Sequence, residues 1–206
     1  MNADELEIKK LIDSWVVWRD AGMWDRLRTV WHDDGGMAAS WRQGTADQFI
    51  AANREGWSKG LDILHLLGGS RIDVAGDRAI SITKMVISQR TTLHGTLCDV
   101  SCFSRHYDFW DRRNGRWGLV QRETIFDRDR LDVVNPGETV TLEQDRLARF
   151  PKNYQHLAYL QSMLGYAVRE DMPCLRSEAA ERLYAQGQRW LDGAAMAPQQ
   201  INSIAA

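Results

Sequence analysis

The middle of the chain alternates apolar and polar residues over four long segments, which are separated by short turn signals. This two-residue period predicts β-strands with one buried face. Gly76-Asp77 marks one turn, and Arg113-Asn114-Gly115 is a strong hairpin signal. Gly68-Gly69 predicts a bulge inside the first strand. The pattern therefore predicts an antiparallel meander of four strands, over residues 63–74, 78–89, 97–111 and 116–127.

Helical spacing replaces this alternation at the beginning of the chain. Residues 3–20 carry one apolar face, and Gly22 ends the helix that they predict. The apolar positions of that face are Leu6, Ile8, Leu11, Ile12, Trp15 and Trp18. A second helix is predicted from Met23 to Trp31. The chain therefore begins with two helices before the first strand.

A turn, a short strand and a third helix follow. Residues 32–36 have the composition of a turn, and a short strand is predicted over residues 37–41. Thr45 is the predicted N-cap of the third helix, which runs to about Ser58. Together these elements predict the α+β class, with a cone-shaped, curved antiparallel sheet wrapped by three N-terminal helices. The open end of such a sheet is filled by side chains or remains a pocket.

The pattern changes again after Asn135-Pro136-Gly137. Short helices are predicted over residues 141–149, 152–165 and 176–192, with prolines between them. We interpret residues 1–135 as one domain and residues 136–206 as a helical C-terminal extension. The extension is too short to bury much surface alone. It is therefore predicted to act as a lid over the pocket or as a contact between subunits.

Composition narrows the class of protein. The 206 residues carry a net charge of −2, which argues against a non-specific nucleic-acid binder. The first ten residues are charged and lack the apolar core of a secretory signal, and no apolar run is long enough to span a membrane. The three cysteines form no paired motif, as expected of reduced thiols in a cytoplasmic protein. Nine tryptophans indicate a core or a pocket with aromatic walls.

Three polar residues stand in unusual positions. His65 lies in a strand among apolar residues, so its ring faces either the core or a pocket. Asp20 ends the first helix, where the helix dipole disfavours a carboxylate, so its position is unusual. The alternative interpretation is an ordinary exposed carboxylate at a helix end. Arg122 lies in the middle of the last strand. On an inner face it needs a partner or an anionic ligand, and on an outer face it is simply solvated.

The other four histidines are less informative. His32 lies in the predicted turn beside two aspartates and is expected to be solvated. His94 lies in a loop from which it can reach the rim of a pocket. His106 shares a strand face with Cys102, and the pattern does not say which face is inward. His156 lies in the extension and is expected at the surface or at an interface.

Three segments with this spacing resemble the SnoaL-like, scytalone-dehydratase-like branch of the nuclear-transport-factor-2-like superfamily. Residues 20–34 look like the segment that carries the branch's catalytic aspartate, with Asp20 as the carboxylate. Residues 64–68 resemble the segment with the catalytic histidine, and residues 112–117 resemble the closing hairpin. Arg122 falls where the related dehydrochlorinase has a pocket arginine. The C-terminal part of the chain, including residues 126–131 and Asn135-Pro136-Gly137, is similar to a subset of SnoaL-like proteins with a longer C-terminus.

The resemblance implies a site and a reaction. His65 would be the general base, Asp20 would hold its ring, and Arg122 would stabilise negative charge on the substrate. The implied substrate-binding residues are Trp15, Trp24, Trp41, His94, Thr124 and Phe126. Trp15 is a departure, since relatives often place a polar residue there. Neither a metal nor an organic cofactor is expected.

Three classes of function fit these expectations. The first is a lyase that removes water or formaldehyde from a small aromatic substrate, such as a lignin-derived diaryl compound. The second is an isomerase or polyketide cyclase, because one fold hosts many chemistries. The third is a non-catalytic module that binds apolar ligands. A homodimer or homotrimer is expected in each case, and neither nucleic acid nor membrane is an expected partner.

Overall fold

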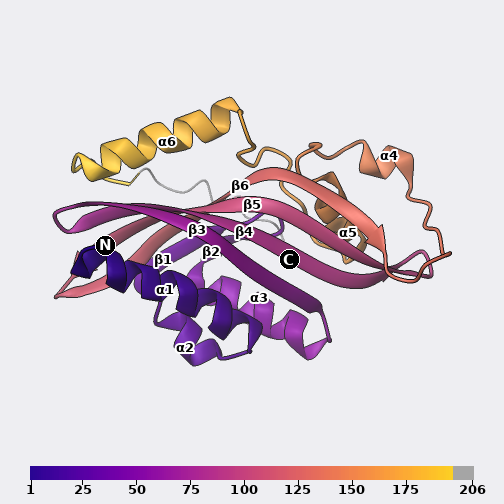
Figure 1. Ribbon diagram of the computed structural model, residues 1–206, viewed down its shortest axis with the longest axis horizontal. Helices are drawn as coiled ribbons and strands as arrows, with labels where there is room; N and C mark the ends of the chain where they lie inside the picture. Colours follow the sequence, from indigo (N-terminus) through magenta and orange to yellow (C-terminus); the bar gives the residue numbers. More distant parts are fainter. Residues whose placement is uncertain (197–206) are drawn as a thin grey trace.

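The computed structural model describes residues 1–196 of the chain. Six strands form one curved, unclosed sheet in the order β2-β1-β6-β5-β4-β3. Neighbouring strands are antiparallel, except that β1 runs parallel to β6. Three N-terminal helices cover one face of the sheet and the C-terminal segment lies against the other face and one end (Figure 1). The predicted α+β class and its curved sheet are confirmed.

The four long strands are those that the alternation predicts. They are β3 (Asp62–Ala75), β4 (Arg78–Leu93), β5 (Thr96–Arg113) and β6 (Arg116–Val133). The pairing of β3 with β4 shifts between Leu67 and Ser70, so the predicted bulge is confirmed. Asn114 and Gly115 both have positive φ, as a two-residue hairpin turn requires. The strands are longer than predicted, because their ends pair with neighbours although their alternation is weak.

The first and third helices also match the sequence pattern. They are α1 (Ala3–Asp20) and α3 (Ala46–Ser58), and the side chain of Thr45 caps α3 as predicted. The second helix, α2 (Trp24–Arg28), is shorter than predicted. Trp31 does not belong to it but begins strand β1 (Trp31–Ala38), where it pairs with Leu119 of β6. A long-range strand pairing here overrides local helical spacing.

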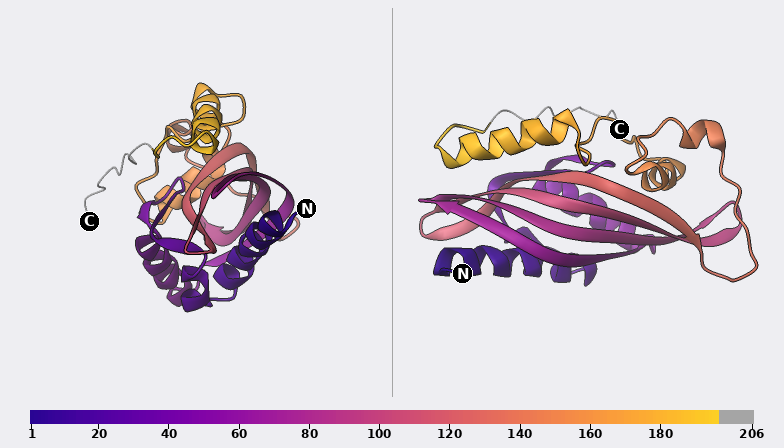
Figure 2. Two further views of the ribbon diagram at one scale, coloured as in Figure 1. Left: turned by 90° about the vertical axis from the view of Figure 1, so that its left-hand side faces the viewer. Right: turned by 45° about the horizontal axis from the view of Figure 1, so that its top comes forward.

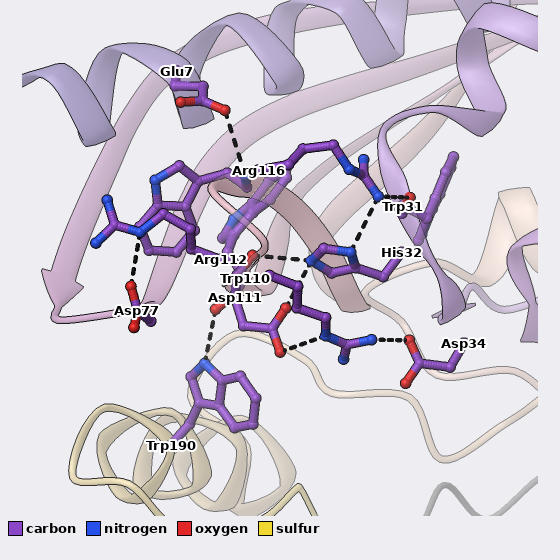
Figure 3. A network of polar contacts seen from close by, with 12 residues as sticks. Glu7, Trp31, His32, Asp34, Asp77, Trp110, Asp111, Arg112, Arg116 and Trp190 are labelled. Carbon is purple, nitrogen blue, oxygen red and sulfur yellow. Dashed lines mark hydrogen bonds and ion pairs between the residues drawn. The ribbon is translucent and has the colours of Figure 1, made fainter.

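His32 is buried and is not solvated as predicted from its sequence context. Its Nε2 lies 3.0 Å from the carbonyl oxygen of Asp111 and 2.7 Å from that residue's carboxylate. Its Nδ1 accepts a hydrogen bond from Arg116 at 3.1 Å, which places the ring proton on Nε2 (Figure 3). A Cβ on Gly118 would lie 2.6 Å from Nε2, so only glycine fits beside this ring. The network joins β1 to the β5–β6 hairpin.

The main core lies between the concave face of the sheet and the N-terminal helices. It is rich in aromatic side chains, as the tryptophan content predicts. Trp15 of α1, Phe49 of α3 and Trp110 of β5 are all buried in it. All three cysteines are also buried and free. Trp15, Trp31, Trp110 and Trp117 therefore lie inside the cone, whereas Trp190 of the C-terminal segment packs on the other face of the sheet.

The C-terminal segment packs on the sheet in two places. Strand β2 (Gln43–Thr45) is an edge strand of this sheet. In the C-terminal segment, the short helix α4 (Gln144–Leu147) comes first. Helix α5 (Gln155–Met163) packs on β5 and β6 through a cluster that includes Val100, Phe126 and Leu157. Helix α6 (Glu178–Leu191) lies on the convex face, opposite α1 (Figure 2). The extension is therefore built on the sheet and has no core of its own.

Helix α6 approaches the sheet closely at Gly187. A Cβ at this position would overlap the hydroxyl oxygen of Tyr107 and lie 2.8 Å from its Cζ. Tyr107 is 1% exposed and packs against Phe109 and Tyr184, so its ring has little room to move. We expect Gly187→Ala to lower the free energy of unfolding by about 1–3 kcal/mol, although alanine favours helix elsewhere.

Urea denaturation of Gly187→Ala beside Gln188→Ala checks this expectation. Gln188 is on the same helix and is exposed, so its substitution should change the unfolding free energy by less than about 0.5 kcal/mol. A Gly187→Ala protein as stable as the parent would show that α6 does not sit on Tyr107 as described.

Candidate active site

An apolar cavity lies between the concave face of the sheet, α1 and α3, with α5 at one end. It contains about 850 Å³ of empty space, its opening included. Its lining is mostly apolar with a few polar side chains, as is typical of small-molecule sites. Aromatic side chains form much of its wall: Trp15, Trp24, Trp41, Phe49, Trp57, Phe126 and Tyr166. The geometry suits an aromatic ligand that is largely shielded from water.

His65 on this wall is held by Asp20. Its Nδ1 lies 2.8 Å from Oδ1 of Asp20, and its backbone N–H donates to Oδ2 at 2.6 Å. Since the carboxylate is an acceptor only, Nδ1 carries the proton and Nε2 keeps a free lone pair. The pair forms because α1 ends at Asp20 beside the outer edge of β3. The end of α1, where the helix dipole disfavours a carboxylate, is therefore the point at which Asp20 reaches β3.

Arg19 and Asn53 support this pair. Arg19 donates to Asp20 at 3.0 Å and to the carbonyl of Ile63 at 3.2 Å. Its remaining nitrogens donate to Oδ1 of Asn53 at 3.2 and 2.9 Å. Asn53 in turn donates to the carbonyl of Phe49 within α3. These bonds tie the end of α1 to α3 and β3, so Asp20 is fixed in place.

The surroundings set the charge state of the pair. Burial lowers the pKa of His65, and the cations Arg19 and Arg122 lower it further, whereas Asp20 opposes the shift. For Asp20, burial favours a higher pKa, but the hydrogen bonds from His65 and the charges of His65 and Arg19 outweigh it, so its pKa is lowered. At neutral pH the pair is a neutral imidazole beside a carboxylate, which is the state that a general base requires.

A second histidine, His106 of β5, also lies on the cavity wall. The indole of Trp15 stands edge-on to both rings, with centroids 5.4 Å from His65 and 5.1 Å from His106. Burial, and then the charge of Arg122, lower the pKa of His106 well below its ordinary value. The sequence does not show whether the strand face that carries His106 points inward. The structure places His106 on the cavity wall.

Arg122 lies behind Trp15 and is not one of the residues that line the cavity. It is fully buried and donates to both oxygens of Asp108, at 2.7 and 2.8 Å. Its guanidinium sits 4.4 Å from the centroid of the Trp15 ring. Arg122, which is predicted to stabilise negative charge on the substrate, thus lies next to the cavity wall and not on it. Arg122 acts on the cavity through its charge and through its support of Trp15.

Some of the predicted substrate-binding residues line the cavity and one does not. Those that line the cavity are Trp15, Trp24, Trp41, Thr124 and Phe126. His94 does not line it: it lies in the β4–β5 turn, with Nε2 2.6 Å from the hydroxyl of Tyr159. His156 and Asp129 form a second His–Asp pair at the start of α5, with Nδ1 2.9 Å from Oδ1, away from the cavity.

Several lining residues had no signal in the sequence. Arg19 could have been found as the neighbour of Asp20, but Asn53, Gln89, Gln161 and Tyr166 become wall residues only through the fold. Gln161 and Tyr166 come from the extension. Within residues 1–196, no three His, Cys, Asp or Glu side chains converge as a metal would require. No helix in that range is long and apolar enough to cross a membrane.

The curved sheet, its helices and the apolar cavity between them define a protein of the nuclear-transport-factor-2-like fold. The chain belongs to the SnoaL-like domain family, which it matches over residues 2–123. It is similar to two solved structures with this fold. One is a type 2 hexachlorocyclohexane dehydrochlorinase, LinA, with 13% identity, a TM-score of 0.53, and coverage of 68% of this chain and 94% of that one. The other is a putative scytalone dehydratase from Novosphingobium aromaticivorans, with 16% identity, a TM-score of 0.51, and coverage of 66% and 95%.

A longer similarity exists to pea pathogenicity protein 2 of Fusarium vanettenii. The two chains are 31% identical over 201 residues, which cover 92% of this chain and 86% of the relative. Because only 8% of this chain is outside the match, most of the C-terminal extension is shared. The two solved structures cover a smaller part of this chain, 68% and 66%. The extension is therefore a common feature of this chain and its sequence relatives.

Proposed function

We propose that the protein is a cofactor-independent lyase that acts on a small aromatic substrate by proton abstraction at His65. The observation that carries the proposal is the Nδ1 bond from His65 to Asp20, on the wall of an apolar cavity. A base that is neutral, oriented and shielded from water is suited to removing a proton. The family membership and the similarity in fold to a dehydrochlorinase and a putative scytalone dehydratase support this class of reaction.

The proposed elimination needs only one proton acceptor. Nε2 of His65 takes a proton from the carbon next to the one that bears the leaving hydroxyl. The C–H electrons form the double bond, the C–O bond breaks, and the imidazolium returns the proton to give water. Asp20 stabilises the imidazolium in the meantime. The charges of Arg19 and Arg122, which also act on His65, help to stabilise the departing negative charge.

A second version of the same step releases formaldehyde from a diaryl compound. Here Nε2 takes the proton of a hydroxymethyl O–H group. The bond between that carbon and the rest of the substrate breaks, formaldehyde leaves, and the bond electrons form the double bond. The neighbouring hydroxyl leaves and takes the proton from the imidazolium to give water. The products are a stilbene, formaldehyde and water, and His65 ends unchanged. The aromatic walls suit such a two-ring substrate.

The experiment uses purified protein in EDTA with no added cofactor. Phenolic β-hydroxy and hydroxymethyl diaryl compounds are incubated with it, ultraviolet absorbance follows a new conjugated product, and a colorimetric assay follows formaldehyde. The proposal expects a conjugated product, and the formaldehyde signal distinguishes carbon–carbon cleavage from dehydration. A substrate that is only isomerised or cyclised, or ligand binding with no product from any compound, would overturn it.

The pH dependence follows from the lowered pKa of His65. The reactive form is the neutral ring, and burial keeps the ring neutral to a pH below the ordinary histidine value of about 6.5. We expect kcat/KM to rise with pH along an acid limb whose midpoint lies below 6.5 and to be flat near neutral pH. A profile from pH 4.5 to 8 measures this limb. A midpoint above 6.5 would contradict a buried, neutral base.

A further inference from the structure

The cavity continues beyond His65 toward α5. On β4, the strand partner of His65 is Ile87, and the partner of Ile63 is Gln89. All four of these side chains line the cavity. Gln89 is therefore two residues further along the sheet than the level of His65, which is about 7 Å. Its partner on β5 is Val100, which packs in one cluster with Leu157 of α5, so Gln89 lies at the end that the extension closes.

Gln89 is an unusual residue for this place. It is 3% exposed, and its amide nitrogen has no hydrogen-bond partner among the described residues. An unpaired buried donor costs about 1–3 kcal/mol, so apolar side chains are normally favoured at such positions. An acceptor supplied by a ligand would remove this cost. The position therefore has the character of a recognition group rather than of core packing.

A second amide faces the cavity from the extension. Gln161 of α5 is 4% exposed, and its Oε1 accepts a hydrogen bond from the hydroxyl of Ser40 at 2.8 Å. The end of the cavity is thus formed by one amide from the sheet and one from the extension. We call Gln89 and Gln161 the amide end.

The charges near the amide end limit what can bind. Arg19 is the only Lys or Arg side chain that lines the cavity in residues 1–196, and its nitrogens are engaged with Asp20, Asn53 and the carbonyl of Ile63. A carboxylate would find no free cation there, and burying it unpaired would be costly. Neutral oxygens, by contrast, are ordinary acceptors for an amide N–H.

We infer that the amide end recognises a neutral oxygen at the far end of an elongated substrate. The substrate class is then an uncharged compound longer than one ring, with its reacting carbon at His65 and a hydroxyl, carbonyl or ether oxygen at Gln89. This inference rests on the proposed function for the position of the reacting carbon. The recognition itself depends only on Gln89, Gln161 and the shape of the cavity.

Binding in a catalytically silent background tests the inference apart from turnover. In His65→Ala, quenching of tryptophan fluorescence gives Kd for trans-stilbene and for trans-4-hydroxystilbene, which differ by one terminal oxygen. We expect the hydroxyl compound to bind about tenfold more tightly, as one hydrogen bond to a buried donor predicts. Adding Gln89→Leu should abolish that preference, whereas adding Gln188→Leu on the exposed face of α6 should leave it intact.

Two results would overturn the inference: an unchanged hydroxyl preference in Gln89→Leu, or no preference in its parent. Stability provides a further check. Because leucine has a similar size and leaves no donor unpaired, Gln89→Leu should keep or raise Tm. A lower Tm would mean that the amide already has a partner in the protein. If no substrate turns over and yet Gln89 governs the hydroxyl preference, the lyase proposal is wrong. The inferred recognition of a neutral oxygen by the amide end is then still supported.

Discussion

Asp108→Ala is expected to lower the free energy of unfolding by about 3–5 kcal/mol. Asp108 and Arg122 are both fully buried and share two hydrogen bonds of 2.7 and 2.8 Å. Removing the carboxylate leaves a guanidinium in the core with no anion beside it. The loss should also disturb Trp15, whose ring lies 4.4 Å from that guanidinium. Denaturation in urea, followed by tryptophan fluorescence, measures both effects.

The matched control is Asp99→Ala on the same strand. Asp99 also makes two hydrogen bonds to an arginine, Arg90, at 2.8 and 2.7 Å, but this pair lies at the surface. Exposed pairs contribute about 0–1 kcal/mol, so the control should be nearly neutral. Similar losses in the two variants would contradict the burial of the Asp108–Arg122 pair.

Asp20→Asn is expected to reduce kcat about 100- to 10,000-fold. An amide in place of the carboxylate can donate to Nδ1, which favours the tautomer with the proton on Nε2. That tautomer has no lone pair directed at the substrate. The amide also cannot stabilise the imidazolium that forms during the reaction. Steady-state kinetics on the substrate found in the product assay would measure the change.

Asp13→Asn serves as the control for this variant. Asp13 lies on the same helix, is exposed, and pairs only with Lys9. Its substitution removes one negative charge, as Asp20→Asn does, but far from the cavity. We expect its kcat to stay within about twofold of the parent. Equal turnover in Asp20→Asn and the parent would remove Asp20 from the mechanism.

The fold was largely predictable because its signals are local. The four-strand meander follows from alternation and from the turn at Asn114-Gly115, and α3 follows from the cap at Thr45. Strand β1 was mispredicted because its pairing with β6 joins residues about ninety positions apart, which local patterns do not encode. His32 was mispredicted for the same reason, since its partners Asp111 and Arg116 lie at the far hairpin.

The candidate site was predictable only in part. The proximity of Asp20 to His65 came from the resemblance to known proteins, because nothing local links a helix end to a strand. The sequence does not show which of His94 and His106 faces the cavity, since the direction of a side chain depends on strand register and on the position of the turn. Asp108 was not recognised as the partner of Arg122, because two adjacent strands had to be aligned residue by residue.

The most direct measurement compares turnover of His65→Ala with that of His156→Ala in the same EDTA-treated assay. Both histidines bond an aspartate through Nδ1, at 2.8 and 2.9 Å, but only His65 lines the cavity. The account predicts that kcat falls about 100-fold or more in His65→Ala and stays near the parent value in His156→Ala. Full turnover in His65→Ala would contradict it, because the proton would then be removed by another group.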